Sequence, residues 1–368
     1  MKKQAEEKDP AKMRHGYTTG ACAAAATKAA LLSLMTGSPC SEVNILLPVG
    51  RRVAFSIEET SFSEGSAACS VIKDAGDDPD ATHGAKIVST VAWVRKKGLH
   101  LDGGIGVGRV TKPGLPVPVG EAAINPVPRK MIAQVVTEVL AELGEERGVH
   151  VVISVPAGEE IAKKTLNERL GIVGGISILG TRGTVVPFST SAYRASVVQA
   201  ISVARANGCD HLVLTTGGSS EKHAMKLYPD LPSEAFIQMG DFVGFALKHA
   251  KRLEAKRVTL VGMMGKFSKV AQGVMMVHSK SAPVDFGFLA AVAEEVGAPF
   301  DLVEEVRGAN TATQAGQLME EAGYSDYFST LSRYVCRQAS RHVGGGLHLE
   351  TVLVKMKGEW LGRAEMAP

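Results

Sequence analysis

The chain has 368 residues, of which 45% are hydrophobic and 21% are charged. This composition is close to that of average globular proteins, so wholesale disorder is excluded, and the length predicts about two domains of roughly 100–200 residues each. The formal net charge is only +3 and no run of five Lys or Arg occurs, so the charge pattern of a nucleic-acid-binding protein is missing. Forty glycines exceed average usage, whereas aromatic residues make up only 5%.

The N-terminal segment Met1–Lys12 is charged and lacks apolar periodicity, so residues 1–13 are expected to form a loose arm. The run Ala21–Met35 is rich in Ala and Leu, but acidic residues precede it and Lys28 interrupts it, which disfavours an export signal or a membrane span. Five cysteines without a C-x-x-C pair favour reduced thiols over disulfides or structural zinc. We therefore expect a soluble, cytoplasmic protein.

The first domain is expected to be α+β and to span residues 14–148. Thr18 or Thr19 can cap the Ala-rich helix, and Gly37 is its expected stop. Short apolar stretches separated by Gly, Pro and Asp then predict a mixed sheet. These stretches are Val43–Leu47, Val53–Ile57, Ala67–Ile72, Ile87–Val94 and Val107–Val110. Helical spacing of the apolar residues in Met131–Leu143 predicts a helix near the end of this domain.

The second domain is expected over residues 149–368. Short apolar runs alternate with amphipathic segments, which predicts a mostly parallel α/β sheet covered by helices. The expected strands are Val151–Val155, Ile176–Leu179, His211–Thr215 and Val258–Val261, and the expected helices lie near Ser191–Ala206, Asp241–Leu253, Phe286–Val296 and Phe328–Val343.

Each expected strand of the second domain runs directly into a glycine-containing loop. The loops contain Gly158, Gly180, Gly217 and Gly262. Ligands of open parallel sheets bind at the carboxyl ends of the strands, where glycine allows the backbone to approach closely. These loops can equally be ordinary tight turns, but four of them on one edge of a sheet favour a ligand-binding edge.

Known nucleotide-binding fingerprints do not fit the glycine segments. In Gly103–Gly108 the third glycine of G-x-G-x-x-G would fall at Arg109, and prolines follow in place of a helix. The pair Gly265-Lys266 is preceded by Leu260 where a P-loop needs glycine. We expect neither a dinucleotide loop nor a P-loop.

Two charged clusters are candidate substrate sites. The segment Lys73–Gly84 contains Asp74, Asp77, Asp78 and His83 without the spacing of a calcium loop, and no metal site is expected. It can be a polar turn whose carboxylates cap backbone amides, or a site where these side chains meet a ligand.

The second cluster contains two pairs of cations on proline-rich loops. They are Arg109, Lys112, Arg129 and Lys130. Such pairs suit the recognition of several carboxylates, and a solvated basic face is the alternative.

Six long segments resemble the CbiD family, in the family's order and over roughly Arg14 to Phe286. They are RHGYTTGACAAAATKAAL, VIKDAGDDPDATHGA, GGIGVGRVTKPGLPVPVGEAAINPVPRKMI, GISILGTRGTVVPFSTSAYRASV, VLTTGGSSEKHA and VGMMGKFSKVAQGVMMVHSKSAPVDF. The resemblance implies a methyltransferase that transfers a methyl group from S-adenosylmethionine to C1 of cobalt-precorrin-5B. The product would be cobalt-precorrin-6A of anaerobic cobalamin (vitamin B12) biosynthesis, with cobalt present only as part of the substrate.

Under this resemblance the residues divide into three sets. The S-adenosylmethionine side would contain Gly217, Gly218, Ser219, Asp241, Gly262 and Gly265, with Asp241 accepting from the ribose. The catalytic site bordering the tetrapyrrole would contain Asp74, Asp77, Asp78 and His83. The acetate and propionate carboxylates of the tetrapyrrole would be bound by Arg109, Lys112, Arg129, Lys130 and Arg182. The first domain would then face the tetrapyrrole and the second the methyl donor.

Two other functions stay open from the residues alone. They are a non-catalytic tetrapyrrole-binding protein and a small-molecule phosphotransferase. No nucleic-acid or membrane partner is expected, and a homo-oligomer is compatible with the sequence.

Overall fold

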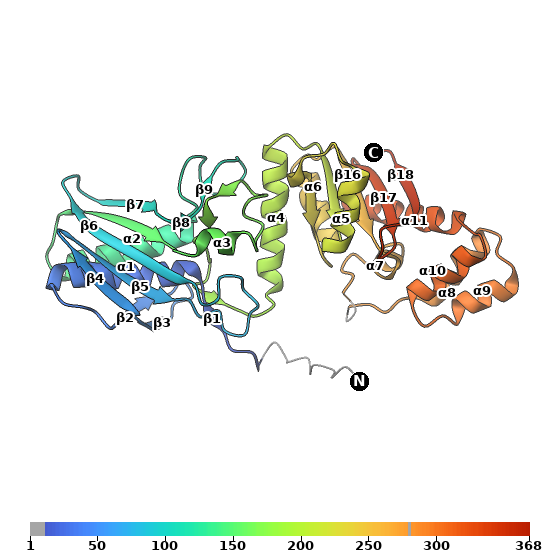
Figure 1. The fold of residues 1–368 in the computed structure, drawn as a ribbon. Helices are drawn as coiled ribbons and strands as arrows, with labels where there is room; N and C mark the ends of the chain where they lie inside the picture. Colours follow the sequence, from blue (N-terminus) through green and yellow to red (C-terminus); the bar gives the residue numbers. More distant parts are fainter. Residues whose placement is uncertain (1–11, 279–280) are drawn as a thin grey trace. The chain divides into compact units, whose positions relative to one another are not determined.

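The computed structural model describes residues 12–278 and 281–368, and the chain divides into two compact units, residues 1–190 and 191–368 (Figure 1). Most of the expected N-terminal arm lies outside the described residues. The division comes later than the boundary expected near Gly148, because β10 (Gly148–Ser154) lies inside the first sheet. It pairs antiparallel with β6 (Lys86–Val94) and parallel with β7 (Leu99–Gly103).

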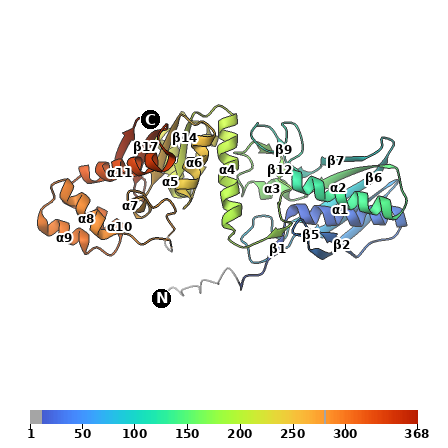
Figure 2. The same cartoon turned by 180° about the vertical axis from the view of Figure 1, so that it is seen from behind.

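Unit 1 is an α+β unit built on a mixed sheet of order β4-β5-β6-β10-β7, with β4 at Glu59–Ser63 and β5 at Ser66–Ile72. A hairpin of β2 (Glu42–Leu46) and β3 (Arg52–Ser56) lies beside it. Helices α1 (Thr19–Thr36) and α2 (Pro126–Glu142) lie side by side, as Figure 2 shows from behind. The predicted mixed sheet and both predicted helices are confirmed.

Helix α1 fits closely against the sheet because its buried side chains are small. Residues Ala21–Ala26 are at most 1% exposed, and the helix contacts β5 and β6. The Thr18 hydroxyl accepts a hydrogen bond from the Ala21 amide at 3.2 Å, and Gly37 ends the helix with φ of 67°. The predicted cap and stop are thus both confirmed.

Three short strand pairs complete unit 1. They are β1 (Gly16–Tyr17) with β13 (Thr184–Val185), β8 (Gly106–Val107) with β12 (Gly175–Ile176), and β9 (Arg109–Val110) with β11 (Ile172–Val173). Helix α3 (Gly158–Ala162) contacts β8 and β12.

The glycines of this region serve close backbone packing. A Cβ atom on Gly106 would lie 1.9 Å from the Val155 carbonyl oxygen, and a Cβ on Gly158 or Gly175 would lie 2.0 or 2.1 Å from the Gly106 carbonyl oxygen. We call Gly106, Gly158 and Gly175 the glycine junction. The expectation that the Gly158 and Gly180 loops belong to the parallel sheet of the second domain is wrong, because both lie in unit 1.

Unit 2 is an α/β unit with a mostly parallel sheet, as predicted. Its order is β15 (Phe236–Gln238), β14 (His211–Thr215), β16 (Arg257–Gly262), β17 (His348–Val354) and β18 (Trp360–Met366). The first four strands are parallel and β18 is antiparallel.

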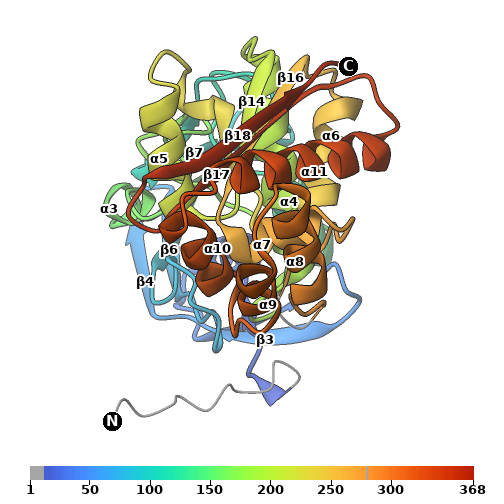
Figure 3. The same cartoon turned by 90° about the vertical axis from the view of Figure 1, so that its right-hand side faces the viewer.

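Unit 2 also contains a set of helices, some of which pack on the sheet and some on other helices. They are α4 (Thr190–Ala206), α5 (Gly218–Leu227), α6 (Val243–Arg252), α7 (Met264–Val270), α8 (Phe286–Glu295), α9 (Phe300–Arg307), α10 (Ala312–Glu321) and α11 (Asp326–Val343). Helix α5 contacts β14, β15 and β16, whereas α11 lies across β17 and β18 (Figure 3). Within the described residues, none of the helices combines the length and apolar character needed to span a bilayer.

A buried carboxylate ties β17 to both neighbouring strands. Glu350 is 0% exposed, accepts from Arg257 at 2.7 Å and from the Thr259 hydroxyl at 2.6 Å, and pairs with Arg363 of β18. Burial alone would raise the pKa of Glu350, but hydrogen bonds from Thr259, Arg257 and Tyr228 outweigh burial and lower it. The C-terminal strand therefore supplies a counter-ion to the interior of the sheet.

Candidate functional site

The strand order of unit 2 reverses between β14 and β16. From β14 the chain passes through α5 to β15 on one side, and from β15 it passes through α6 to β16 on the other side of β14. The carboxyl ends of β14 and β16 therefore flank a topological switch point, where open α/β sheets bind their ligands.

The loop after β14 is open toward solvent at its glycines. Gly217 precedes α5 without a side-chain cap, and a Cβ atom on it would meet nothing within 4 Å. Gly218 and Ser219 are exposed in the first turn of α5. The first amides of a helix lack partners within the helix and favour an anionic group such as a carboxylate.

Asp241 follows β15 at the same edge of the sheet. Its Oδ1 atom lies 3.0 Å from Lys266 Nζ, and this ammonium also donates to the Thr216 carbonyl oxygen at 3.1 Å. Lys266 thereby ties three segments together: the loop after β14, the loop after β15 and the first turn of α7. Predicted residues Gly217, Gly218, Ser219 and Asp241 thus belong to one edge.

The remaining two glycines of this set differ from each other. A Cβ on Gly262 would lie 2.7 Å from Cε1 of Phe267 and 3.0 Å from Cγ2 of Thr216, so Gly262 allows tight packing beneath the edge. A Cβ on Gly265 would meet nothing within 4 Å. Gly265 therefore resembles Gly217 in facing open space.

Polar residues that the sequence analysis missed support the loop after β15. Gln238 donates to Glu221 at 2.7 Å, and its backbone oxygen accepts from the Tyr193 hydroxyl at 3.1 Å. Burial, with the negative charges of Asp241 and Glu221, raises the pKa of Tyr193. The Tyr193 phenol therefore stays neutral and donates its hydrogen bond to the Gln238 carbonyl oxygen.

In the sequence, Lys266 stands out only as the lysine of a Gly-Lys pair that does not fit a P-loop. The signal that could have found it is a cation in the first turn after a parallel strand, two loops away from an acidic residue at the same edge.

In unit 1 the predicted acidic cluster is held by its own neighbours. Asp74 pairs with the Arg14 guanidinium and accepts from the Gly76 amide at 2.9 Å. Asp77 accepts from the Arg14 amide and Asp78 from the Phe188 amide, both at 2.9 Å. The three carboxylates accept from backbone amides: the Asp74 contact lies within the turn, whereas Asp77 and Asp78 tie the loop to segments far away in sequence.

Asp74 is poorly suited to proton transfer. The Arg14 guanidinium and the Gly76 amide lower its pKa to about 2, so the carboxyl is ionised at neutral pH and is a weak base. His83 accepts from the Ala75 amide at Nδ1, at 3.1 Å, which places the proton of the neutral ring on Nε2. His83 is about half exposed and is the member of the cluster best placed to meet a ligand.

We expect Asp74→Asn to weaken unit 1 by less than about 1 kcal/mol at neutral pH, because the Arg14 pair is largely exposed. The folded-state pKa of Asp74 is depressed, so its contribution is present above the unfolded value near 4 and is lost as pH falls toward about 2. Urea unfolding at pH 7 and pH 2.5 measures this: the difference between parent and variant should shrink at the lower pH. An equal difference at both pH values would contradict it.

The predicted cations have different surroundings. Arg109 pairs with Asp102 at 2.9 Å, and Arg129 pairs with Glu121 at 2.9 Å and donates to the Ile124 carbonyl at 2.7 Å. These two arginines brace the strands and loops around them.

Lys130 and Arg182 are exposed, whereas Lys112 lies against Gly171. The Arg182 loop is fixed to the start of α1 by a hydrogen bond from the Thr18 amide to the Gly183 oxygen at 3.1 Å. The acidic loop reaches the same segment, because the Tyr17 amide donates to the backbone carbonyl oxygen of Asp74 at 2.7 Å. The structure therefore brings Arg182 and the acidic loop to one end of unit 1.

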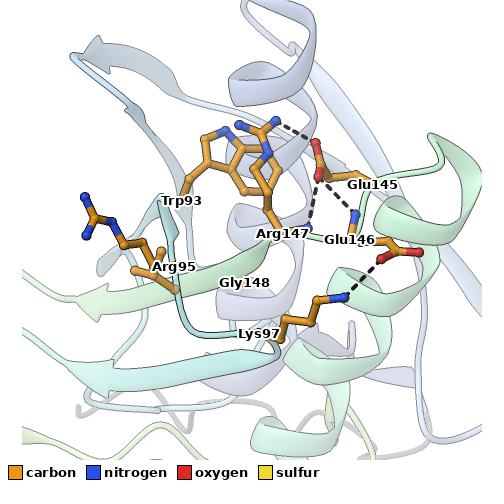
Figure 4. A pocket seen from close by; sticks show the side chains of 8 residues that line it. Trp93, Arg95, Lys97, Glu145, Glu146, Arg147 and Gly148 are labelled. Carbon is orange, nitrogen blue, oxygen red and sulfur yellow. Dashed lines mark hydrogen bonds and ion pairs between the residues drawn. The ribbon is translucent and has the colours of Figure 1, made fainter.

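Two surface hollows occur in the described part of unit 1. The first, of about 490 Å³, is lined by Trp93, Val94, Arg95, Lys97, Glu145, Glu146, Arg147 and Gly148 (Figure 4). It contains none of the predicted site residues, and the Arg147 guanidinium carbon lies 3.9 Å from the centre of the Trp93 ring system. This hollow therefore supports none of the predicted site residues.

The second hollow, of about 660 Å³, is lined by Leu99, His100, Leu101, Asp102, Arg129, Ala133 and His150. Arg129 is the one predicted site residue that lines a hollow described here. Within residues 12–278 and 281–368, no three His, Cys, Asp or Glu side chains are grouped so as to hold a metal ion.

Comparison with known proteins gives matches along most of the chain. The family model described as CbiD matches residues 6–187, and the model described as CbiD, C-terminal domain, matches residues 276–365. A protein of Geobacillus kaustophilus (strain HTA426) is 68% identical over 96% of this chain and 95% of its own length. A protein of Priestia megaterium is 64% identical over 97% of both chains. Both are named cobalt-precorrin-5B C(1)-methyltransferase.

A crystal structure of the cobalamin biosynthesis protein (cbiD) from Archaeoglobus fulgidus is also similar. It is 27% identical, covers 84% of this chain and 85% of its own, and has a TM-score of 0.39.

Proposed function

Because this chain belongs to the CbiD family, we propose that it is the methyltransferase that methylates C1 of cobalt-precorrin-5B, with S-adenosylmethionine as methyl donor. The near full-length identity to relatives bearing that name carries the assignment of substrate and reaction. The single structural observation that supports a donor site is the glycine-lined switch point between β14 and β16.

The donor fits this edge by its chemistry. Its carboxylate suits the uncapped first turn of α5 after Gly217, and its ribose hydroxyls suit the carboxylate of Asp241. Dinucleotide-binding sheets use the same arrangement, with an acidic residue about 20 residues beyond the glycine loop that accepts from a ribose hydroxyl. We assign Gly217, Gly218 and Ser219 to the methionine part of the donor and Asp241 to its ribose.

The reaction is a direct displacement at the methyl group of the sulfonium by the nucleophilic ring carbon, without a covalent enzyme intermediate. The protein's main contribution is to hold the two reactants in line, and well-oriented reactions gain up to about 7–11 kcal/mol in this way. The low pKa of Asp74 agrees with a mechanism in which acid–base catalysis is secondary.

On the substrate side we assign the end of unit 1 where the Arg182 loop and the acidic loop meet the start of α1. The exposed guanidinium of Arg182 and the exposed Lys130 are the predicted cations best suited to acetate and propionate groups. Arg109 and Arg129 already pair with Asp102 and Glu121, so their role is to shape the neighbouring loops.

Incubation of the full chain with cobalt-precorrin-5B and S-adenosylmethionine tests the proposal. Mass spectrometry should show a gain of one methyl group. S-adenosylmethionine that carries ¹³C in its sulfonium methyl group should transfer the label to C1. A chain that binds the tetrapyrrole without labelling it would contradict the proposal and would fit a carrier. Binding of ATP in place of S-adenosylmethionine would fit a phosphotransferase.

Asp241→Asn is expected to weaken binding of S-adenosylmethionine about tenfold, because one charged acceptor for the ribose is replaced by a neutral one. The matched control is Asp210→Asn: Asp210 also pairs with a lysine, Lys256, but it precedes β14 at the opposite end of the strands. Calorimetry measures both variants. Unchanged affinity of Asp241→Asn, or an equal loss in Asp210→Asn, would show the ribose assignment to be wrong.

A further inference from the structure

Lys266 spans the two halves of the edge at which we place the methyl donor. Its ammonium donates to the Thr216 carbonyl oxygen in the loop after β14, at 3.1 Å, and lies 3.0 Å from Asp241 Oδ1 in the loop after β15. The Lys266 amide donates to the Met263 oxygen, so the residue starts from the ordered first turn of α7. One side chain therefore ties three segments that are far apart in sequence.

The pairing fixes the orientation of the Asp241 carboxylate. Oδ1 is occupied by Lys266, and across the described ranges 12–278 and 281–368 Oδ2 has no hydrogen-bond partner. The Asp241 side chain is 24% exposed, so it is accessible to a ligand without being freely solvated. A carboxylate that is held by one oxygen can offer the other in a fixed direction.

The same ammonium acts on the loop that begins α5. Thr216 immediately precedes Gly217, and the Thr216 hydroxyl lies 3.1 Å from the Ser220 hydroxyl. Loss of the Lys266 contact would leave the Thr216 carbonyl without this donor at the entrance of the helix. A change at Lys266 thus reaches both the amides of the first turn of α5 and the carboxylate of Asp241.

We propose that Lys266 is a positioning residue of the donor site: it orients Asp241 for the ribose and holds the Thr216–Gly218 loop in register with it. This inference rests on the proposed function, since it takes S-adenosylmethionine as the ligand of the edge. Lys266 acts through Asp241 and Thr216 and takes no part in the chemical step.

A double-mutant cycle tests the coupling. Lys266→Met is expected to weaken S-adenosylmethionine binding about tenfold, and Asp241→Asn about tenfold. The variant carrying both changes should bind within about threefold of Asp241→Asn alone, because the part of the lysine's effect that runs through the carboxylate is already lost and only the Thr216 contact remains to be lost. The cycle of Lys256→Met with Asp210→Asn is the control, since this pair lies at the opposite end of the strands and should leave affinity unchanged.

Four further readouts separate positioning from loss of fold. Lys266→Arg keeps a cation with several donors and should recover most of the affinity. Methylthioadenosine has the ribose but no carboxylate. It should bind the Lys266→Met variant more weakly than the parent, as S-adenosylmethionine does. In steady-state assays the change should raise KM for the donor more than it lowers kcat. Circular dichroism of each variant should match the parent.

The outcomes distinguish the two proposals. If the parent protein does not bind S-adenosylmethionine, the donor assignment itself is wrong. If the parent binds but Lys266→Met binds equally well, or the losses of the two variants multiply in full, the positioning role is wrong and the donor assignment stands. A fall in kcat alone with unchanged KM would also overturn the positioning role.

Discussion

Gly217→Leu is expected to reduce the affinity for S-adenosylmethionine by about 100-fold, a loss of about 2.7 kcal/mol, because the added side chain would exclude the donor from its assigned place. A Cβ on Gly217 would point into open space at the edge, and a leucine side chain there would occupy the volume assigned to the methionine part of the donor. The backbone of Gly217 is extended, so leucine introduces no strain.

The fold of the Gly217 variant should survive. Replacing glycine by an apolar residue before a helix costs about 1 kcal/mol at most, because only the capping preference of the position is lost. Gly217→Ser is the matched control: serine is a good cap and adds two small atoms. Calorimetry should show a strong loss for leucine and a mild one for serine. Equal affinities for leucine and parent would remove the glycine loop from the donor site.

Gly175→Ala is expected to destabilise unit 1 by about 3 kcal/mol or more, because an added methyl group in a closely packed region forces backbone shifts. The new Cβ would lie 2.1 Å from the Gly106 carbonyl oxygen and 2.2 Å from its carbonyl carbon, and both atoms belong to backbone that is paired in β8 and β12. No side chain can move to relieve this contact.

The matched control for Gly175→Ala is Gly308→Ala. A Cβ on Gly308 would have its nearest neighbour at 3.5 Å, an ordinary contact, and the residue has a negative φ. Urea unfolding followed by circular dichroism should show a large loss for Gly175→Ala and a change within about 0.5 kcal/mol for Gly308→Ala. A Gly175→Ala protein as stable as the parent would mean that the glycine junction is looser than its geometry indicates.

Local patterns predicted the regular elements well. The cap at Thr18, the stop at Gly37, strand β14 and helix α11 follow from hydrogen-bonding residues, a positive φ or helical periodicity, all of which depend on neighbours in sequence. The short helices α9 and α10 and the C-terminal strands β17 and β18 were not anticipated. Strand β17 is buried along both faces although it contains polar residues, and β18 has no regular alternation of burial, so their pairing depends on contacts with β16 and α11.

The division of the chain could not be predicted from composition. The apolar run at β10 reads equally well as the first strand of a second domain or as an inner strand of the first sheet. Only its pairing with both β6 and β7 decides between them. For the same reason the alternation of strands and helices wrongly predicts that the Gly158 and Gly180 loops share an edge with Gly217, although they lie in unit 1.

At the candidate site the sequence identified the residue types better than their partners. Gly217, Gly218 and Asp241 follow from the alternation of strands and helices. Lys266 and Tyr193 do not, because their contacts join segments separated by tens of residues. The acidic loop shows the opposite limit: four acidic residues in twelve suggested a ligand site, whereas Arg14 and backbone amides account for Asp74, Asp77 and Asp78.

The position of β18 has a consequence for synthesis on the ribosome. The buried Glu350 of β17 receives its Arg363 counter-ion from the last strand of the chain. Strand β10 completes the sheet of unit 1 less than halfway along the chain, so that sheet can form while translation continues. The sheet of unit 2 stays incomplete until β18 has left the exit tunnel. Nascent chains that stall before Arg363 would therefore carry an open sheet edge and an interior carboxylate that lacks one of its two arginine partners.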